Sequence, residues 1–216
     1  MMDFSDFDWA DSNDWFRRTI SQEMNDMMYE RLFKVNDGDI VVDAGASVGP
    51  FIRSILAKDF AKCYAVEPMT GYHAAIRNNT DERVTIVPGA FSDEEEVSIN
   101  WLDSIETVKG FTLPRFVEEY GIERIDFLKT DCEGGEYTIF KEENLEWLKA
   151  NCKYCVGEWH LSYPEVNDKF RKVRDTIFPK LKRVVVFSVN GFDITSMLHT
   201  EEFMNYYKEV IIHIEI

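Results

Sequence analysis

The stretch Ile40-Val41-Val42-Asp43-Ala44-Gly45-Ala46-Ser47-Val48-Gly49 decides the fold of this 216-residue chain. It is a short β-branched run, followed by an acid and then by a turn of small residues with two glycines. Apolar residues follow at helical spacing, at Phe51, Ile52, Ile55, Leu56 and Phe60. A β-branched run, a glycine turn and an amphipathic helix together indicate the strand–turn–helix unit of a nucleotide-binding fold.

The composition limits the possible partners. The chain is 45% hydrophobic and 30% charged, which is typical of a globular protein. Its length suits one core, so we expect a single domain over 1–216, with an arm and helix over 1–35 and the nucleotide-binding core over 36–216. Because 24 Lys and Arg face 40 Asp and Glu, the net charge is −16. That field repels phosphate and anionic lipid, so we expect neither a nucleic-acid nor a membrane partner; the oligomeric state stays open.

The N-terminus and the cysteines predict the compartment. The chain begins with acidic residues rather than a basic, apolar signal, and no apolar run approaches the ~20 residues of a membrane span. Cys63, Cys132, Cys152 and Cys155 show no disulfide spacing, and the Cys152–Cys155 pair lacks the second pair that a zinc site needs. We therefore expect a reduced, cytoplasmic protein with no metal site.

Strand-like runs alternate with helical patterns along the chain. The predicted strands lie at 39–44, 63–68, 83–88, 124–131, 154–160, 183–188 and 209–214. The predicted helices lie at 14–33, 51–60, 71–79, 112–120, from 133 to 148, and 166–181. This alternation indicates a mostly parallel sheet with helices on both faces. Residues 97–101 are expected to form a small extra strand, and residues 1–13 a loose arm. The segment 189–207 shows no helical period that would indicate a crossover helix, so the final strand is expected to run antiparallel.

Acidic residues stand at the ends of several predicted strands. Asp43, Glu67 and Asp131 follow the first, second and fourth strands, and Glu158 lies in the fifth. Ligands of such sheets bind beyond the carboxyl ends of the strands, so these side chains are expected to share one cleft. An electronegative cleft suits a ligand that carries positive charge.

The glycine turn distinguishes two candidate cofactors. A dinucleotide fold uses the pattern G-x-G-x-x-G, whose backbone amides approach a pyrophosphate, whereas this chain has Ser47 and Pro50 at the second and third glycine positions. Asp43 would also repel a pyrophosphate. S-adenosylmethionine has no phosphate and carries an ammonium and a sulfonium, so acids attract it. Glu67 suits the ribose hydroxyls of either cofactor. The pattern favours S-adenosylmethionine, and an NAD-dependent oxidoreductase is the less favoured alternative.

Five segments in a fixed order resemble the FkbM family of S-adenosylmethionine-dependent methyltransferases. They are 42–49, 65–68, 89–93, 125–136 and 157–160. The first is common to class I methyltransferases, whereas the Asp131–Glu136 block is more selective. The chain departs from the family pattern at Ser47, usually Asn, and at Pro114, usually Asp. The resemblance implies a Rossmann-like α/β three-layer sandwich with a seven-stranded, mostly parallel sheet of order 3-2-1-4-5-7-6 and an antiparallel last strand.

The resemblance and the strand positions together assign the cofactor residues. We expect Asp43 and Gly45 beside the methionine part, Gly49 to permit close packing, Glu67 at the ribose, and the segment Gly89-Ala90-Phe91 beside the adenine. The complete expected set is Asp43, Gly45, Ala46, Ser47, Gly49, Glu67, Pro68, Gly89, Ala90, Phe91 and Asp131.

The expected catalytic residues are Asp131, Glu133 and His160. Histidine as a residue type titrates near neutrality, which makes His160 the preferred general base; Tyr163 is an alternative. A divalent cation held by Asp131, Glu133, Glu158 and His160 is a less favoured alternative. The resemblance implies methylation of a hydroxyl oxygen on a small molecule or glycan. The competing interpretation is a protein that binds S-adenosylmethionine without turnover. We expect the acceptor pocket to involve the N-terminal helix and the segments 161–165 and 189–207.

Overall fold

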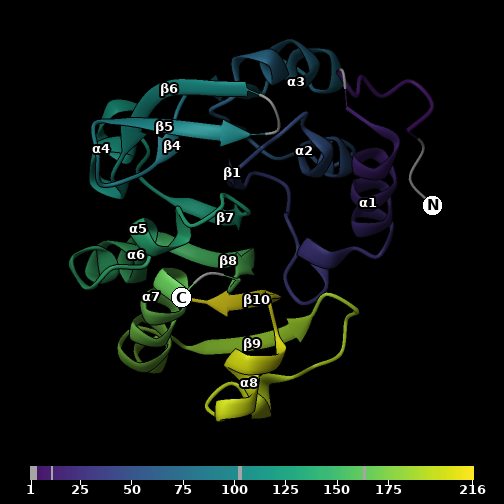
Figure 1. Ribbon diagram of the computed structural model, residues 1–216. Helices are drawn as coiled ribbons and strands as arrows, with labels where there is room; N and C mark the ends of the chain where they lie inside the picture. The colour runs from purple at the N-terminus through teal and green to yellow at the C-terminus, as the bar shows by residue number, and fades with distance from the viewer. Residues whose placement is uncertain (1–3, 11, 102–103, 163) are drawn as a thin grey trace.

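A computed structural model of the chain describes residues 4–10, 12–101, 104–162 and 164–216. A seven-stranded sheet crosses the molecule in the order β3-β2-β1-β7-β8-β10-β9 (Figure 1). Its strands are β1 (Ile40–Ala44), β2 (Lys62–Val66), β3 (Val84–Val87), β7 (Ile125–Thr130), β8 (Cys152–His160), β9 (Arg183–Ser188) and β10 (Glu209–Glu215). Numbered within this sheet alone, the order is 3-2-1-4-5-7-6, and only the last strand runs antiparallel to its neighbours. The predicted fold class and strand order are confirmed.

Helices cover both faces of this sheet (Figure 1). One face carries α1 (Asp14–Asn25), α2 (Pro50–Ile55) and α3 (His73–Asn79). The other carries α4 (Leu113–Glu119), α5 (Glu136–Ile139), α6 (Leu145–Asn151), α7 (Pro164–Thr176) and α8 (Glu201–Tyr206). Short 3-10 helices complete the layers: η1 (Met28–Glu30), η2 (Thr70–Tyr72), η3 (Glu142–Asn144), η4 (Phe178–Lys180) and η5 (Thr195–Met197).

β1 is the central strand, and its sequence explains that position. Val41 and Val42 are fully buried and belong to the cores on opposite faces of the sheet, so the strand needs apolar side chains on both sides. The turn after β1 ends at Gly49, whose φ of 86° favours glycine. Pro50 then begins α2, where its fixed φ suits the first helical position.

A second, three-stranded sheet lies beside the first and was only partly predicted. Its order is β4 (Ala90–Phe91), β6 (Ser104–Phe111) and β5 (Glu96–Trp101). The extra strand expected at 97–101 is confirmed as β5. The partner strand β6 was not predicted because polar residues interrupt its alternation and because Ile105, an apolar member, is 73% exposed. No strand was predicted at 90–91, where the structure has β4.

The N-terminal segment is packed, so the prediction of a loose arm was wrong. Phe7 is only 6% exposed, and its ring lies 4.5 Å from that of Trp9. The Asp8 amide donates to Asn79 Oδ1 over 2.7 Å, and Asn78 Nδ2 donates to the Asp8 carboxylate over 2.7 Å. These contacts fasten the segment to α3.

Two predicted helices and the segment 189–207, which was expected to be aperiodic, also differ in detail. The helix expected over 14–33 ends at Asn25, because Met27 adopts a left-handed φ of 51° before η1 begins. The helical spacing of Trp15, Ile20 and Met24 predicts a buried apolar face, but Trp15 is 72% exposed and does not belong to it. The helix expected from 133 to 148 is divided into α5 and α6 by η3, and the segment 189–207 contains η5 and α8. In the part of the chain that the structure describes, none of the helices has both the length and the apolarity to cross a bilayer.

Candidate active site

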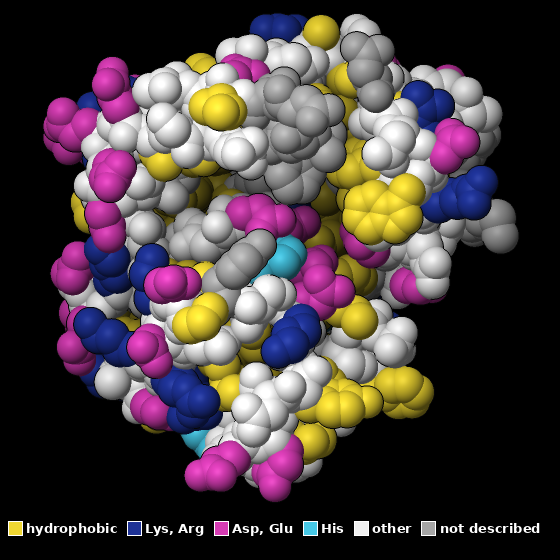
Figure 2. All heavy atoms as spheres, in the orientation of Figure 1, with side chains coloured by type: hydrophobic (Ala, Val, Ile, Leu, Met, Phe, Trp, Pro, Cys, Tyr) yellow, Lys and Arg dark blue, Asp and Glu magenta, His cyan; other side chains and the backbone are white. Residues whose placement is uncertain are grey.

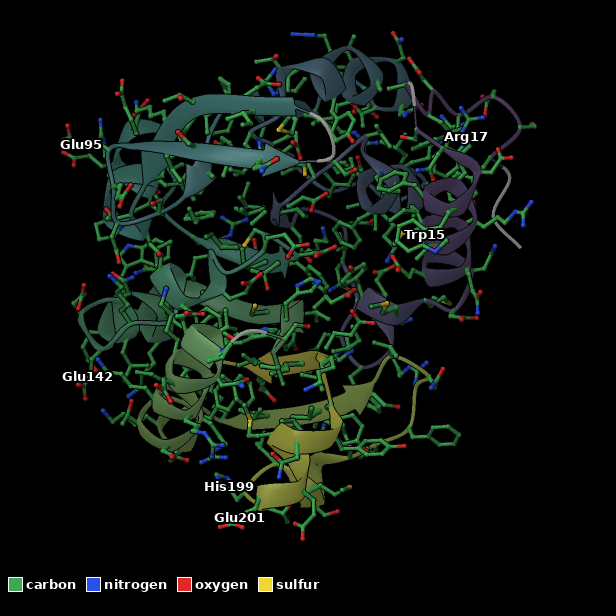
Figure 3. The ribbon with its side chains drawn as sticks, viewed as in Figure 1. Trp15, Arg17, Glu95, Glu142, His199 and Glu201 are labelled. Carbon is green, nitrogen blue, oxygen red and sulfur yellow. The ribbon has the colours of Figure 1, made fainter. Side chains whose placement is uncertain are left out.

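A cavity of about 300 Å³ opens at the carboxyl ends of β1, β2, β7 and β8. Ten predicted site residues line it: Gly45, Ser47, Glu67, Pro68, Gly89, Ala90, Phe91, Asp131, Glu133 and His160. One wall comes from α1, including Trp15, which is labelled in Figure 3. Figure 2 shows the hollow on this face, with acidic side chains gathered around a histidine. The topology therefore brings most of the predicted set together.

The turn after β1 packs directly onto the end of β7. Gly45 has a φ of 80°, and a Cβ at this position would lie 1.8 Å from the Asp131 carbonyl oxygen. The Asp131 amide donates to Ala44 O over 2.9 Å, which fixes the two strand ends together. Only glycine fits this conformation and this approach, so the turn has a rigid, side-chain-free floor.

The amides of this turn are already used within the protein. Those of Gly45 and Ala46 donate to Val66 O over 2.9 and 3.1 Å. The amide of Ser47, a residue with a left-handed φ of 51°, donates to Glu67 Oε2 over 2.7 Å. A dinucleotide-binding turn presents such amides to a pyrophosphate. Here they hold the end of β2 instead, which favours a ligand without phosphate.

Glu67 is held from behind and faces the cavity. Its two carboxylate oxygens each accept one backbone hydrogen bond, from Ser47 N and from Met69 N, both over 2.7 Å. Burial raises the pKa of Glu67 to about 7, although these two hydrogen bonds lower it. A carboxylate has about four lone-pair sites, so each oxygen retains one for a ligand hydroxyl.

Asp43 does not line the cavity, because its side chain is fully buried. It is the register partner of Lys129 on β7, whose Nζ lies 3.1 Å from Asp43 Oδ1 and donates to Gly45 O over 2.8 Å. Burial raises the pKa of Asp43 to about 6, and Lys129 opposes that shift. Burial lowers the pKa of Lys129, but Asp43 and Asp131 outweigh burial and hold it above its usual value.

Gly49 and Ala46 also lie outside the cavity lining. A Cβ at Gly49 would make only an ordinary 3.5 Å contact with Thr80 Cγ2, so the expected reason, close packing, was wrong; its φ of 86° is the constraint. Gly89 is the residue that needs close packing, since a Cβ there would lie 2.5 Å from Phe111 Cε2. Beside it, Phe91 packs edge-on against Phe116 at 5.2 Å and also lines the cavity.

The side chains at the ends of β7 and β8 form the acidic end of the cavity. Asp131 accepts a hydrogen bond from Tyr29 Oη over 3.2 Å. His160 Nε2 lies 3.6 Å from the carboxylates of both Glu133 and Glu158. Its other ring nitrogen, Nδ1, is buried and has no hydrogen-bond partner within the described segments. The histidine is therefore oriented by acids rather than by a backbone acceptor.

Glu136 differs from Glu133, although the two were expected to open one helix. Glu136 is fully buried, and its carboxylate accepts from Cys132 N and Gly134 N, both over 2.9 Å. It closes the turn that precedes α5. Glu133 adopts a left-handed φ of 51° and turns a half-exposed side chain to the cavity.

A second, larger cavity of about 400 Å³ adjoins the first. It lies between α1 and the β9–β10 region, and its lining is mostly polar. Glu23, Glu158 and Glu209 line both cavities and so form the border between them. Burial raises the pKa of Glu158 to about 9, with further contributions from Asp131, Glu23 and Glu209. The border therefore brings three carboxyl groups together, and burial with their mutual repulsion favours the protonated form of Glu158 in the absence of a cation.

Sequence reasoning missed three charged residues of the site. Lys129 had a local signal, because a lysine in an apolar central strand requires a buried acid beside it. Glu209 faces His160 in the antiparallel pair of β10 and β8, a register that the aperiodic segment before β10 concealed. Glu23 comes from α1, the helix expected at the acceptor pocket, but no local pattern distinguishes Glu23 from the other polar residues of that helix. Tyr163, the alternative base, lies outside the described residues.

A comparison with protein-family models identifies the family to which the chain belongs. The model described as the methyltransferase FkbM domain matches residues 34–189, which contain nearly all of the sheet and its acidic strand ends. The chain belongs to the FkbM methyltransferase family. S-adenosylmethionine, the cofactor expected from the sequence, is the methyl donor that this family uses. A comparison with curated protein sequences gave no significant match.

Solved structures agree with this FkbM fold. One similar structure is a fibrillarin/Nop5p complex, with 15% identity over 88% of this chain and 78% of that chain, at a TM-score of 0.53. Another is a precorrin-6y C5,15-methyltransferase from Geobacter metallireducens GS-15, with 12% identity over 100% of this chain and 96% of that chain, at a TM-score of 0.50. At these identities the likeness concerns the fold alone.

Proposed function

We propose that this FkbM family member transfers the methyl group of S-adenosylmethionine to a hydroxyl oxygen of a small molecule or glycan. One observation carries the proposal: the 300 Å³ cavity offers ligand-facing carboxylates, while the amides of its glycine turn are already used. Carboxylates accept hydrogen bonds from hydroxyls and attract cationic groups, as a sulfonium nucleoside requires. They would repel the pyrophosphate of NAD.

Different residues around the cavity would bind the ribose, the methionine part and the adenine of the cofactor. Glu67 would accept hydrogen bonds from the ribose hydroxyls with its free lone pairs. The turn from Gly45 to Ser47 would pack against the methionine part, and the Ser47 hydroxyl, buried without a hydrogen-bond partner in the described residues, would bind there. Pro68 and the segment 89–91 would flank the adenine. Asp43 would act through Lys129, which it keeps charged at the floor.

The chemistry divides between the cofactor and the chain. When bound, the cofactor supplies an electrophilic methyl group. The protein must align the acceptor oxygen with it, exclude water and remove a proton. We assign proton removal to His160, because it lines the cavity and its Nε2 lies 3.6 Å from the carboxyl groups of Glu133 and Glu158. Asp131 would orient the cofactor and the acceptor between the two cavities.

The polar 400 Å³ cavity is the proposed acceptor site. Hydroxyl-rich molecules suit its many hydrogen-bonding groups, and its wall includes α1 and the segment after β9. Since α1 lines both cavities, we propose that residues 1–35 belong to the same domain as the core. The net charge of −16 argues against a nucleic-acid acceptor or a membrane surface. The four free thiols agree with the proposed cytoplasmic location.

Calorimetric titration tests the cofactor assignment. We expect S-adenosylhomocysteine to bind and NADH not to bind; tight binding of NADH without S-adenosylhomocysteine would contradict the proposal. Transfer is then measured with methyl-tritiated S-adenosylmethionine and a panel of hydroxylated saccharides. Asp131→Ala and His160→Ala should lose transfer while far-UV circular dichroism stays unchanged. If the protein binds the cofactor but shows no turnover with any acceptor, the non-catalytic alternative is favoured.

A further inference from the structure

We propose that Glu158, His160 and Glu209 form a binding site for a divalent cation at the border of the two cavities. Each residue offers one ligand atom, and the three atoms lie within 4.8 Å of one another. This distance is close to the spacing of ligands around a single metal ion, so only small side-chain adjustments would complete the site. The inference rests on the proposed function for its placement between the donor and the acceptor.

The backbone explains why these three side chains converge. Glu158 and His160 are two residues apart on β8, so they project from the same face of the strand. Glu209 is the antiparallel register partner of His160, and directly opposed residues share a face of the sheet. All three therefore stand on one side of a paired strand end, which provides a rigid platform rather than a flexible loop.

Glu158 supplies the observation that points to a ligand. The residue is 9% exposed, and its carboxylate accepts no hydrogen bond from any residue that the structure describes; the nearest basic atom is His160 Nε2 at 3.6 Å. It lines both cavities and so faces the proposed site. A buried carboxylate without a donor is costly, and a bound cation would compensate it.

A lysine and an arginine lie near the border, and neither forms an ion pair with Glu158 in the described residues. Arg31 lines the 400 Å³ cavity, where its Nη1 donates to Gly191 O over 2.5 Å. Lys129 Nζ lies 3.1 Å from Asp43 and 3.9 Å from Asp131, so it forms ion pairs with these two residues at the 300 Å³ cavity. Figure 2 shows acidic side chains gathered around a histidine in the hollow. Among the described residues, His160 is the one basic side chain within ion-pair distance of Glu158.

The ligand set indicates the kind of cation. Two carboxylates with one imidazole suit Mn²⁺, and carboxylate and water ligands also suit Mg²⁺. The position differs from the alternative considered from sequence, because Glu209 replaces Asp131 and Glu133. A cation here would contact both cavities and hold an acceptor oxygen near the donor. His160 would then be a ligand rather than the base in the cation-bound protein.

Electron paramagnetic resonance during titration with Mn²⁺ tests the inference on the full chain. We expect one Mn²⁺ to bind per chain, Mg²⁺ to compete with it, and pulsed spectra to show coupling to a histidine nitrogen. Glu158→Gln and Glu209→Gln should each weaken Mn²⁺ binding by at least tenfold, and His160→Gln should remove the nitrogen coupling. Glu201→Gln, an exposed acid on α8 labelled in Figure 3, is the matched control and should change nothing.

The same preparations are titrated with S-adenosylhomocysteine, which separates the two proposals. Binding of S-adenosylhomocysteine by the wild type, by Glu158→Gln and by Glu209→Gln shows that these proteins are folded. Absence of a Mn²⁺ site in a protein that binds S-adenosylhomocysteine overturns the cation inference and leaves the proposed function intact. Mn²⁺ binding that is equal in the wild type and in both variants overturns it as well. A Mn²⁺ site with the expected variants but no S-adenosylhomocysteine binding supports the cation and contradicts the proposed function.

Discussion

The two ends of the cleft at the carboxyl ends of the strands differ in the partners of their carboxylates. At β1 and β2, the carboxylate of Glu67 accepts two backbone hydrogen bonds and Asp43 is paired with Lys129. At β8 and β10, the carboxylate of Glu158 has only His160 at 3.6 Å, and Glu209 stands beside them. The carboxylates at the first, satisfied end have backbone amides or a lysine as partners, whereas Glu158 at the second, unsatisfied end has only a histidine beside it.

This difference separates binding from chemistry. An end whose carboxylates already have amide or lysine partners is preformed, so it can select a ligand by shape and by its few remaining lone pairs. A buried carboxylate without a hydrogen-bond donor, such as that of Glu158, destabilises its end until a cation, a proton or a substrate arrives, which is common where chemistry takes place. Four variants test whether the two ends really differ in this way, beginning with the largest expected effect.

Removing the charge of Lys129 should damage the satisfied end most. Lys129→Met leaves Asp43 buried without its partner, and the loss of one member of a buried pair costs about 3–5 kcal/mol. Urea unfolding at pH 8 measures the free energy of unfolding. Lys149→Met is the control, because Lys149 pairs with Glu146 on the exposed surface, where a pair contributes about 0–1 kcal/mol. Equal losses in the two variants would show that the buried pair is not important.

The glycine floor should be the next most sensitive feature. Gly45→Ala adds a left-handed alanine, at about 1–2 kcal/mol, and overpacking against Asp131 O, at about 1–3 kcal/mol. Gly38→Ala is matched in backbone conformation, with a φ of 79°, but a Cβ there meets nothing within 4 Å, so only the first cost applies. Thermal unfolding and S-adenosylhomocysteine titration compare them. We expect at least about tenfold weaker binding for Gly45→Ala alone; unchanged binding would contradict the assigned floor.

Glu67 should make stability fall as the pH rises. Its pKa is about 7 when folded and near 4.5 in the unfolded chain, so between these values the folded state binds more protons. At about 1.4 kcal/mol per pKa unit, the group contributes roughly 3 kcal/mol below pH 4.5, and that contribution is lost as the pH rises through 7. Urea unfolding of the wild type and Glu67→Gln at pH 5 and 7.5 isolates the effect, since other groups cancel. A constant difference between the two proteins would contradict it.

The smallest effect is expected at the unsatisfied end. His160 makes ion-pair contacts at 3.6 Å and no side-chain hydrogen bond in the described part of the chain, so His160→Gln should change the free energy of unfolding by less than about 1 kcal/mol. Affinity for S-adenosylhomocysteine should stay within about threefold, a change below 1 kcal/mol. Calorimetry measures both. A large loss of affinity for S-adenosylhomocysteine would show that the β8–β10 end also binds the cofactor, which would contradict the separation of binding from chemistry.

The features that could be predicted from the sequence are those that a local pattern of residues indicates. The β1 run, the glycine turn and the acids of Glu67 and Asp131 mark strand ends, and parallel strands bring such ends together. The N-terminal helix was expected beside the acceptor pocket, and α1 does line both cavities. Glu23 on this helix was missed because the residues that a helix turns toward a cleft depend on packing between distant segments. β6 was missed because its exposed face carries little hydrophobic signal. The pairing of Glu209 with His160 depends on a register that an aperiodic connection hides.

A crystal structure of the protein with S-adenosylhomocysteine tests the central claim most directly. The account predicts density for the nucleoside in the 300 Å³ cavity, with the ribose hydroxyls donating to Glu67 and the sulfur directed toward the border with the 400 Å³ cavity. Density for the nucleoside in the larger cavity, or a ribose that makes no hydrogen bond to Glu67, would contradict it.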